Sequence, residues 1–161
     1  MGITTVIGFI ALATSFMVGI GPNLSLFVDL PCVIIVVGGT VAALFISFPL
    51  KDITEDIPTK CLGYCIVPPK TRNATVDRRL SVGIEVYRRA GTYAFAAGWV
   101  GVLIGIVIMA RNVADISLEN FGPGLSICML PVLYGTVISY LVCLPIRTKL
   151  ARIQAEIATA E

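Results

Sequence analysis

Few side chains in this sequence could do chemistry, and the most suggestive are the two thiols of CLGYC, Cys61 and Cys65. A closely spaced pair of cysteines can form half of a zinc site. The chain has no histidine and no matching second pair, so we expect neither a metal site nor a cofactor. The other cysteines, Cys32, Cys128 and Cys143, fall in apolar stretches, which does not suggest a disulfide framework.

Other active-site chemistry is also missing. We find no set of nucleophile, base and orienting residue that could share a site, so the sequence does not predict an enzyme. The net charge is only +2, and aromatic and basic residues are not interleaved as they are on a base-stacking surface. Nucleic acid is therefore not an expected partner.

The most informative chemical feature is an absence inside four uncharged stretches, residues 1–28, 30–50, 90–110 and 120–146. Acids and histidines within a membrane normally mark proton relays or ion sites. None of these stretches contains Asp, Glu, Lys, Arg or His. This chain alone therefore cannot relay a proton through a side-chain acid.

The elements that would hold these residues are membrane helices. Hydrophobic residues make up 57% of the chain and charged residues 14%, against about 25% charged in soluble domains. Each uncharged stretch can supply the roughly 20 residues that a membrane helix needs. We predict an all-α membrane protein of one domain, with four transmembrane helices, a short cytoplasmic amphipathic helix and a helical tail. The expected spans are residues 3–20, 31–50, 91–111 and 123–146, the loop is 51–90 and the tail is 147–161.

The basic residues predict the orientation. Eight of the 12 Lys and Arg residues lie in the loop and three in the tail. Because cytoplasmic segments collect positive charge, we expect the loop and both termini to be cytoplasmic.

Helical spacing returns in the second half of the loop. Val76, Leu80, Ile84 and Tyr87 share one face, and Asp77, Arg78, Glu85, Arg88 and Arg89 lie opposite. Glu85 precedes Arg88 and Arg89 at favourable spacings, and we expect this helix to continue into the third span. It could be a solvated collar packed against a neighbouring subunit, or Arg78, Arg79, Arg88 and Arg89 could form a docking surface for a cytoplasmic partner.

Small residues occur inside the spans at helical spacing. GWVGVLIG places Gly98, Gly101 and Gly105 close to one line, and such residues let membrane helices approach closely. Gly38 and Gly39 in VVGGTVAA predict a second smooth face. The hydroxyl of Thr40 is expected to bond to a carbonyl of its own helix. These faces could pack within one subunit or form a seam in a homo-oligomer.

Several motifs together resemble the MotA/TolQ/ExbB superfamily, most closely MotA-type stator subunits. FVDLPCVIIVVGGTVAALFISFPLKDI resembles the second span of that family. GWVGVLIGIVIMARNVAD resembles the third, and GPGLSICMLPVLYGTVISYLVCLPIRTKL the fourth, with Gly135 in its Leu-Tyr-Gly centre and Pro145 near its end.

The resemblance implies a homopentameric ring in the bacterial inner membrane. In that family the third and fourth helices line a pore around single-span partners of the MotB, ExbD or TolR kind. The partner supplies the Asp that takes up a proton or sodium ion. Our predicted helix-packing residues are therefore Gly38, Gly39, Gly98, Gly101 and Gly105, together with Gly135 of the Leu-Tyr-Gly motif, and we predict a hinge at Pro145.

The sequence departs from the family at positions that should face the pore. Val102, Pro131 and Val132 stand where the family has threonines, so Val102, Ile127, Pro131, Val132 and Tyr134 are our pore-facing or partner-facing candidates. The family's proline before the third span is replaced by Phe95. The loop lacks the large cytoplasmic domain of stators, which argues against a flagellar role.

Pro131 suggests how an ion path could persist without threonines. Proline has no N–H, so the carbonyl of Ile127 loses its helical partner. That carbonyl could face the pore, with the hydroxyls of Ser126 and Tyr134 as weaker candidates, or a neighbouring helix could bind it. Two functions remain open: a subunit of an ion-driven membrane motor, and a non-conducting membrane scaffold with the same fold.

Overall fold

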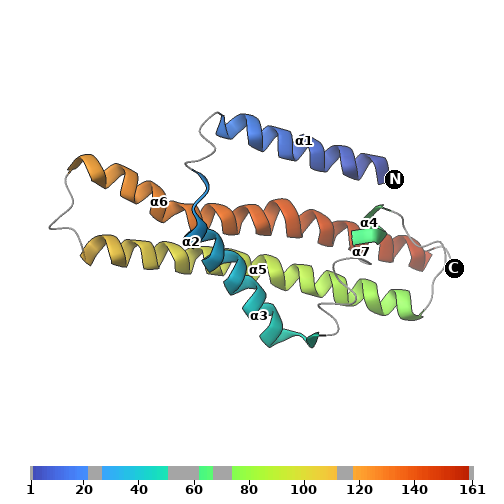
Figure 1. Cartoon of the computed structure of the whole chain (residues 1–161). Coiled ribbons are helices and arrows are strands. Elements are labelled where there is room, and N and C mark those ends of the chain that lie inside the picture. The colour runs from blue at the N-terminus through green and yellow to red at the C-terminus, as the bar shows by residue number, and fades with distance from the viewer. Residues whose placement is uncertain (1, 22–26, 51–61, 67–73, 112–117, 160–161) are drawn as a thin grey trace.

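A computed structural model describes residues 2–21, 27–50, 62–66, 74–111 and 118–159, and these segments are almost entirely helical (Figure 1). Two short π-helical segments, η2 and η4, interrupt the second and the last long helix. In chain order the elements are α1 (Gly2–Ile20), α2 (Leu30–Val33), η2 (Ile34–Gly38), α3 (Gly39–Ser47), α4 (Leu62–Ile66), α5 (Ala74–Arg111), α6 (Leu118–Thr136), η4 (Val137–Cys143) and α7 (Leu144–Thr159). The predicted all-α class is confirmed.

Three described helices are long and apolar enough to cross a membrane, namely Leu30–Ser47, Ala74–Arg111 and Phe121–Thr159. They correspond to the second, third and fourth expected spans. The first expected span forms α1, a helix of 19 residues that includes the apolar stretch Ile10–Gly19. Four spans therefore stays a prediction, while the membrane class agrees with these three helices.

The third and fourth spans continue far beyond the uncharged stretches. Helix α5 runs unbroken for 38 residues, so the amphipathic segment does continue into the third span as predicted. Its antiparallel neighbour, α6–η4–α7, likewise joins the fourth span to the tail (Figure 1). The α2–η2–α3 segment crosses α5 obliquely, and α1 begins at the same end of the molecule where α7 ends (Figure 1).

Local sequence explains where several helices begin and end. The Asp29 carboxylate caps α2 by accepting a hydrogen bond from the Cys32 N–H at 3.4 Å, and Pro31 suits the first turn. Helix α3 ends at Ser47, followed by an extended Phe48 that precedes Pro49. Gly21, at φ 66°, ends α1 with its N–H bonded to the Met17 carbonyl at 3.2 Å.

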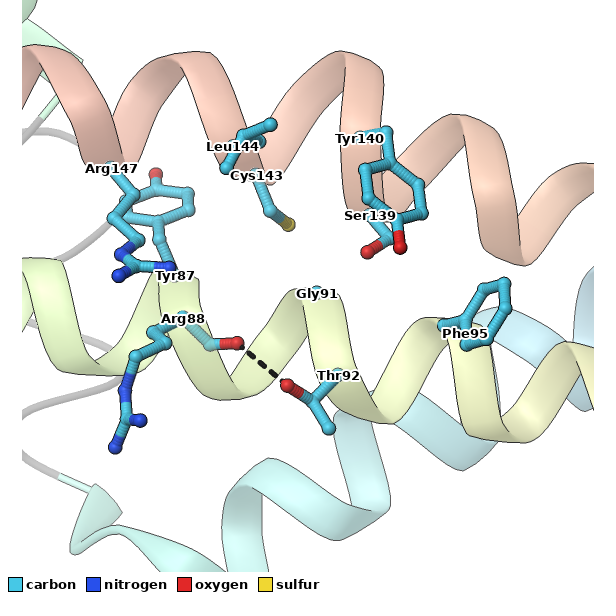
Figure 2. Close-up of a pocket in the computed structure, with 10 residues that line it drawn as sticks. All are labelled: Tyr87, Arg88, Gly91, Thr92, Phe95, Ser139, Tyr140, Cys143, Leu144 and Arg147. Atoms are coloured by element: carbon cyan, nitrogen blue, oxygen red, sulfur yellow. Dashed lines mark hydrogen bonds between the residues drawn. The ribbon is translucent and has the colours of Figure 1, made fainter.

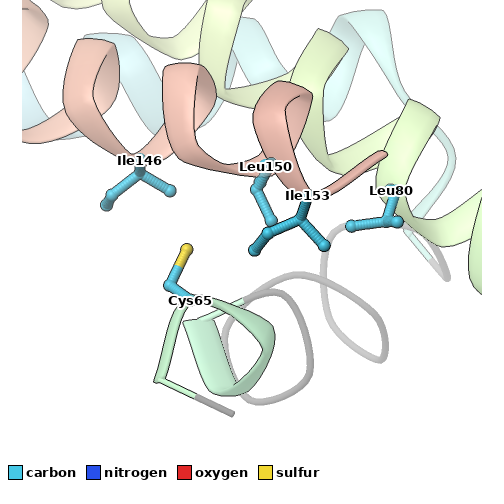
Figure 3. Packing of buried hydrophobic residues seen from close by; sticks show 5 residues of the cluster. All are labelled: Cys65, Leu80, Ile146, Leu150 and Ile153. Carbon is cyan, nitrogen blue, oxygen red and sulfur yellow. The ribbon is translucent and has the colours of Figure 1, made fainter. Parts of the chain in front are cut away.

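The apolar core outside the expected spans lies between α5, α7 and α4. Leu80 and Leu150 are fully buried there, beside Cys65, Ile146 and Ile153 (Figure 3). The apolar face predicted for the loop helix packs on this cluster. This apolar face therefore contacts α7 and α4 of the same chain, and a collar packed against a neighbouring subunit stays a prediction.

Cys65 belongs to this cluster as a packing residue. Burial raises the pKa of its thiol, and the charge of Lys149 lowers that pKa by a smaller amount. The thiol is thus held in its neutral form. Cys61, like the rest of 51–61 and 67–73, lies outside the described residues, so the structure does not test the thiol pair.

Candidate functional site

Helix α5 contacts α6 most closely at its glycines. A Cβ atom added to Gly101 would lie 2.6 Å from the Pro131 Cβ, and one added to Gly105 would lie 2.9 Å from the Cys128 Sγ. At Gly98 the added Cβ would lie 2.7 Å from the Pro131 carbonyl oxygen. Such separations are shorter than carbon atoms normally tolerate, so the two helices can be this close only because these side chains are absent.

Gly135 makes the reciprocal contact from α6. Its added Cβ would lie 2.5 Å from the Ala94 carbonyl oxygen and 3.3 Å from the Gly98 Cα. The glycines therefore face one another across a seam inside a single chain. For the α5 glycines the structure thus shows the first of the two alternatives, packing within one subunit, and a seam in a homo-oligomer stays a prediction.

The paired glycines of the second span have unequal surroundings. An added Cβ on Gly39 would lie 3.4 Å from the Ala97 Cβ of α5, which is ordinary contact, whereas one on Gly38 would meet nothing within 4 Å. Buried Thr40 donates its hydroxyl hydrogen to the Val36 carbonyl at 2.5 Å, as predicted. Only one side of this smooth face is thus used within the chain.

The five candidates for pore or partner contact divide into two groups. Val102 is 3% exposed and Pro131 is fully buried, because both side chains lie within the chain's own helix packing. Ile127 is 53% exposed, and Val132 and Tyr134 are half-buried. Among Val102, Pro131 and Val132, which replace the family's threonines, only Val132 therefore has a partly exposed side chain. The assignment of all five residues to the pore stays a prediction.

Tyr134 makes a contact that the sequence analysis did not predict. Its hydroxyl donates to the Phe27 carbonyl and accepts from the Asp29 N–H at 3.2 Å. The Ser126 hydroxyl donates to the Gly122 carbonyl at 3.0 Å within its own helix. Both weaker candidates for an ion contact thus already donate their hydroxyl hydrogens to backbone carbonyls.

Pro145 stands at a change of helix type. It is the second residue of α7, directly after the π-helical segment η4, and the helical run continues through it. A π-helical turn widens the hydrogen-bond ring and is frequent at functional positions. The predicted hinge at Pro145 is not tested by one conformation.

The arginines of the loop helix differ in their partners. Arg88 binds Glu85 through two hydrogen bonds, at 2.8 Å from Nε and 2.5 Å from Nη2, and the Arg89 Nε lies 2.9 Å from the same carboxylate. These contacts confirm the predicted pairing. Hydrogen bonds from Arg88 and then Arg89 lower the pKa of Glu85 to about 2. Arg78 is exposed, and docking by these four arginines, Arg79 included, remains a prediction.

A cavity of about 310 Å³ between α5 and η4–α7 was not foreseen (Figure 2). Its lining includes Arg88, Gly91, Ser139, Tyr140 and Arg147. An added Cβ on Gly91 would lie 3.3 Å from both the Cys143 Cβ and the Ser139 Oγ, so this glycine keeps the two helices close at the cavity. The cavity could not be predicted from the sequence, because it depends on the register between α5 and α7, which are far apart in the chain.

No group of three or more His, Cys, Asp or Glu side chains suited to a metal ion occurs in the part of the chain that the structure describes. What remains is a close-packed helical hairpin of two long apolar helices with polar extensions. These features define an all-α membrane protein. The profile of the MotA/TolQ/ExbB proton channel family matches residues 70–160, which are α5 to α7, and this chain belongs to that family.

Individual relatives agree with this assignment. The chain is 24% identical to Motility protein A of Aquifex aeolicus over 212 aligned positions, which cover 94% of this chain and 83% of the relative. It is 37% identical to the chemotaxis protein PomA of Vibrio alginolyticus over 78 residues, covering 48% of this chain and 30% of PomA. Motility protein A of Cereibacter sphaeroides is 36% identical to the chain over 111 residues, which cover 68% of this chain and 40% of the relative. The chain thus spans most of the first relative but less than half of the other two.

Proposed function

We propose that this chain is the ring-forming subunit of an ion-driven membrane motor in the bacterial inner membrane. Five copies would surround single-span partners of the MotB, ExbD or TolR kind, with both termini in the cytoplasm. Family membership supports a proton-channel class of membrane protein. The partner would contribute the ion-binding Asp, because the uncharged spans of this chain offer no acid of their own.

The observation that carries the ring is an uncovered apolar face on α5. Trp99, Leu103 and Val107 recur every four residues and are 51%, 59% and 60% exposed. Because the glycines occupy the side of α5 that meets α6, this face is left for lipid, further copies or a partner helix. Helix α5 has large side chains on one face and small ones on the other. This arrangement is compatible with a ring in which each subunit contributes one α5–α6 hairpin.

The motor function is tested by measuring the number of copies in the assembly and the ion flux. Native mass measurement of the purified protein should give five copies, and a monomer would remove the motor proposal. Co-expression with a single-span partner of the MotB, ExbD or TolR kind should give proton or sodium flux in vesicles. Replacing the partner's intramembrane Asp by Asn should abolish that flux while leaving the ring intact.

The non-conducting scaffold remains the second candidate because of three specific residues. Val102, Pro131 and Val132 replace threonines of the family pattern, and the first two are buried within the chain. A stable ring that conducts no ion with any single-span partner would favour this function. A flagellar load is not proposed, since the loop between the second and third spans comprises only residues 51–90.

A further inference from the structure

The cavity between α5 and η4–α7 lies where the apolar part of each helix meets its charged extension. On α5 the uncharged stretch begins at Ala90, and on the opposite helix it ends at Ile146. The cavity lining includes residues on both sides of these boundaries, from Tyr87 to Phe95 and from Ser139 to Arg147. Its expected depth is therefore the headgroup region of the leaflet on the loop side.

One end of the cavity is cationic. Arg88 and Arg147 both belong to the lining at that end, and Figure 2 shows the Arg147 guanidinium beside the Tyr87 ring, whereas the Arg88 guanidinium points away from η4–α7. Glu85 neutralises Arg88 through the contacts described above. Across the described residues, by contrast, Arg147 has neither an ion pair nor a hydrogen bond from its side chain. Among the described residues, one positive charge at the cavity thus has no compensating acid.

The other end is aromatic and opens onto the apolar surface. The rings of Phe95 and Tyr140 meet edge to face with centroids 6.1 Å apart, away from the arginines (Figure 2). Tyr140 is 55% exposed and Leu144 is 45% exposed, so the lining continues into the surface that faces the bilayer. A small soluble anion would use only the cationic end, whereas a molecule with an anionic head and an apolar chain would use both.

We propose that this cavity binds an anionic phospholipid, with the Arg147 guanidinium holding its phosphate and one acyl chain lying along Phe95, Tyr140 and Leu144. A guanidinium fork matches phosphate oxygens in bidentate geometry and is weakly hydrated. Basic pockets between membrane helices on the cytoplasmic side suit anionic headgroups. The volume of about 310 Å³ accommodates a headgroup, while the chain lies outside on the surface. The proposal rests on α5 and α6–α7 crossing the membrane, and ion conduction plays no part in it.

The test is retention of dioleoylphosphatidylglycerol by the full chain in detergent, counted by native mass spectrometry. Wild type should keep one phosphatidylglycerol per chain, in preference to phosphatidylcholine. Arg147→Gln should lower the retained fraction about tenfold, as expected for losing a charge-assisted contact. Arg147→Lys should fall between the two, because lysine keeps the charge without the fork.

Arg78→Gln is the matched control, since it removes the same charge from an exposed position of α5 that is remote from the cavity. It should retain phosphatidylglycerol as wild type does. Helicity measured by circular dichroism shows whether each variant is folded. If Arg147→Gln does not fold, the comparison is made between wild type and Arg147→Lys. Equal retention by wild type, Arg147→Gln and Arg147→Lys would overturn the proposal. Displacement of the phospholipid by excess inorganic phosphate would also overturn it, because the site would then take free phosphate.

Discussion

The hydroxyl of Tyr134, on α6, links the fourth span to the start of the second span by bonding to the Phe27 carbonyl and the Asp29 N–H. Both backbone groups precede the first turn of α2, where no helical hydrogen bond is available to the Asp29 N–H. Tyr134 therefore positions the beginning of the second span against α6. The Asp29 side chain caps that same turn.

Removing this hydroxyl should weaken the attachment of the second span. Tyr134→Phe is expected to lower the free energy of unfolding in mixed micelles by about 0.6 kcal/mol and at most roughly 1.7 kcal/mol, the range for hydrogen bonds between membrane helices. Tyr140→Phe is the matched control, because Tyr140 is half-exposed and contributes a ring contact with Phe95 that phenylalanine keeps. Equal stability of the two variants would show that the Tyr134 contacts contribute nothing.

The glycine seam makes a second prediction with an internal control. Gly135→Ala would put a methyl group 2.5 Å from the Ala94 carbonyl oxygen, which is backbone and cannot rotate away. We expect it to destabilise the chain by about 1–3 kcal/mol, the usual cost of overpacking. Gly38→Ala meets nothing within 4 Å and should be neutral or slightly stabilising, since alanine is the better helix former.

The measurement for these variants is the unfolding free energy, together with the mass of the assembled particle. If Gly135→Ala or Gly101→Leu dissociated the oligomer while each chain stayed as stable as wild type, the seam would lie between subunits, against the contacts seen here. Loss of chain stability before any loss of assembly is the expected order.

Sequence reasoning reached the long helices because their signals are local. Uncharged stretches and the spacing of Val76, Leu80, Ile84 and Tyr87 predicted both α5 and the face that packs on α7. The Thr40 and Glu85 contacts were also predictable, because their partners lie within four residues in the chain.

The remaining features depend on register between distant segments. Glycine spacing marks a close contact, but the partner of Gly101 is Pro131 of the same chain, which only the antiparallel packing of α5 and α6 determines. The Tyr134 contact joins residues 105 apart in sequence, and the cavity lies between α5 and η4–α7 beside Gly91. Lone hydroxyls and glycines carry no sequence signal for such partners.

Glu85 should make stability depend on pH in the acid range. Its pKa falls from an ordinary 4.5 to about 2 because Arg88 and then Arg89 bind the carboxylate. A lowered pKa in the folded state means that the contribution is fully present above pH 4.5 and is lost as the pH falls through about 2. The side chains are 39–48% exposed, so salt should weaken the effect.

Comparing wild type with Glu85→Gln isolates this contribution. We expect wild type to be the more stable above pH 4.5 and the two curves to converge as the pH approaches about 2. Thermal unfolding followed by circular dichroism at a series of pH values measures the difference. A gap between the curves that does not change with pH would mean that the ion pair is not its source.

Pro131 offers the sharpest test of ion conduction. Helix α6 continues through this residue, whose missing N–H deprives the Ile127 carbonyl of its usual partner. An unpaired carbonyl at membrane depth needs protein groups or water to satisfy it. Since Ser126 and Tyr134 already donate to backbone carbonyls, the Ile127 carbonyl remains our candidate for the polar contact that the family's threonines would make.

Pro131→Ala should therefore reduce ion-coupled activity while leaving assembly intact. The change restores the backbone bond to Ile127, a gain of up to about 3 kcal/mol in helix propensity. It also removes ring carbons from the contact with Gly101, at about 0.8 kcal/mol for each buried CH₂. The two effects oppose each other, so stability should change little. Pro123→Ala, an exposed proline in the same helix, is the control and should leave ion flux in vesicles unchanged. Full activity of Pro131→Ala in an intact ring would refute a role for this carbonyl.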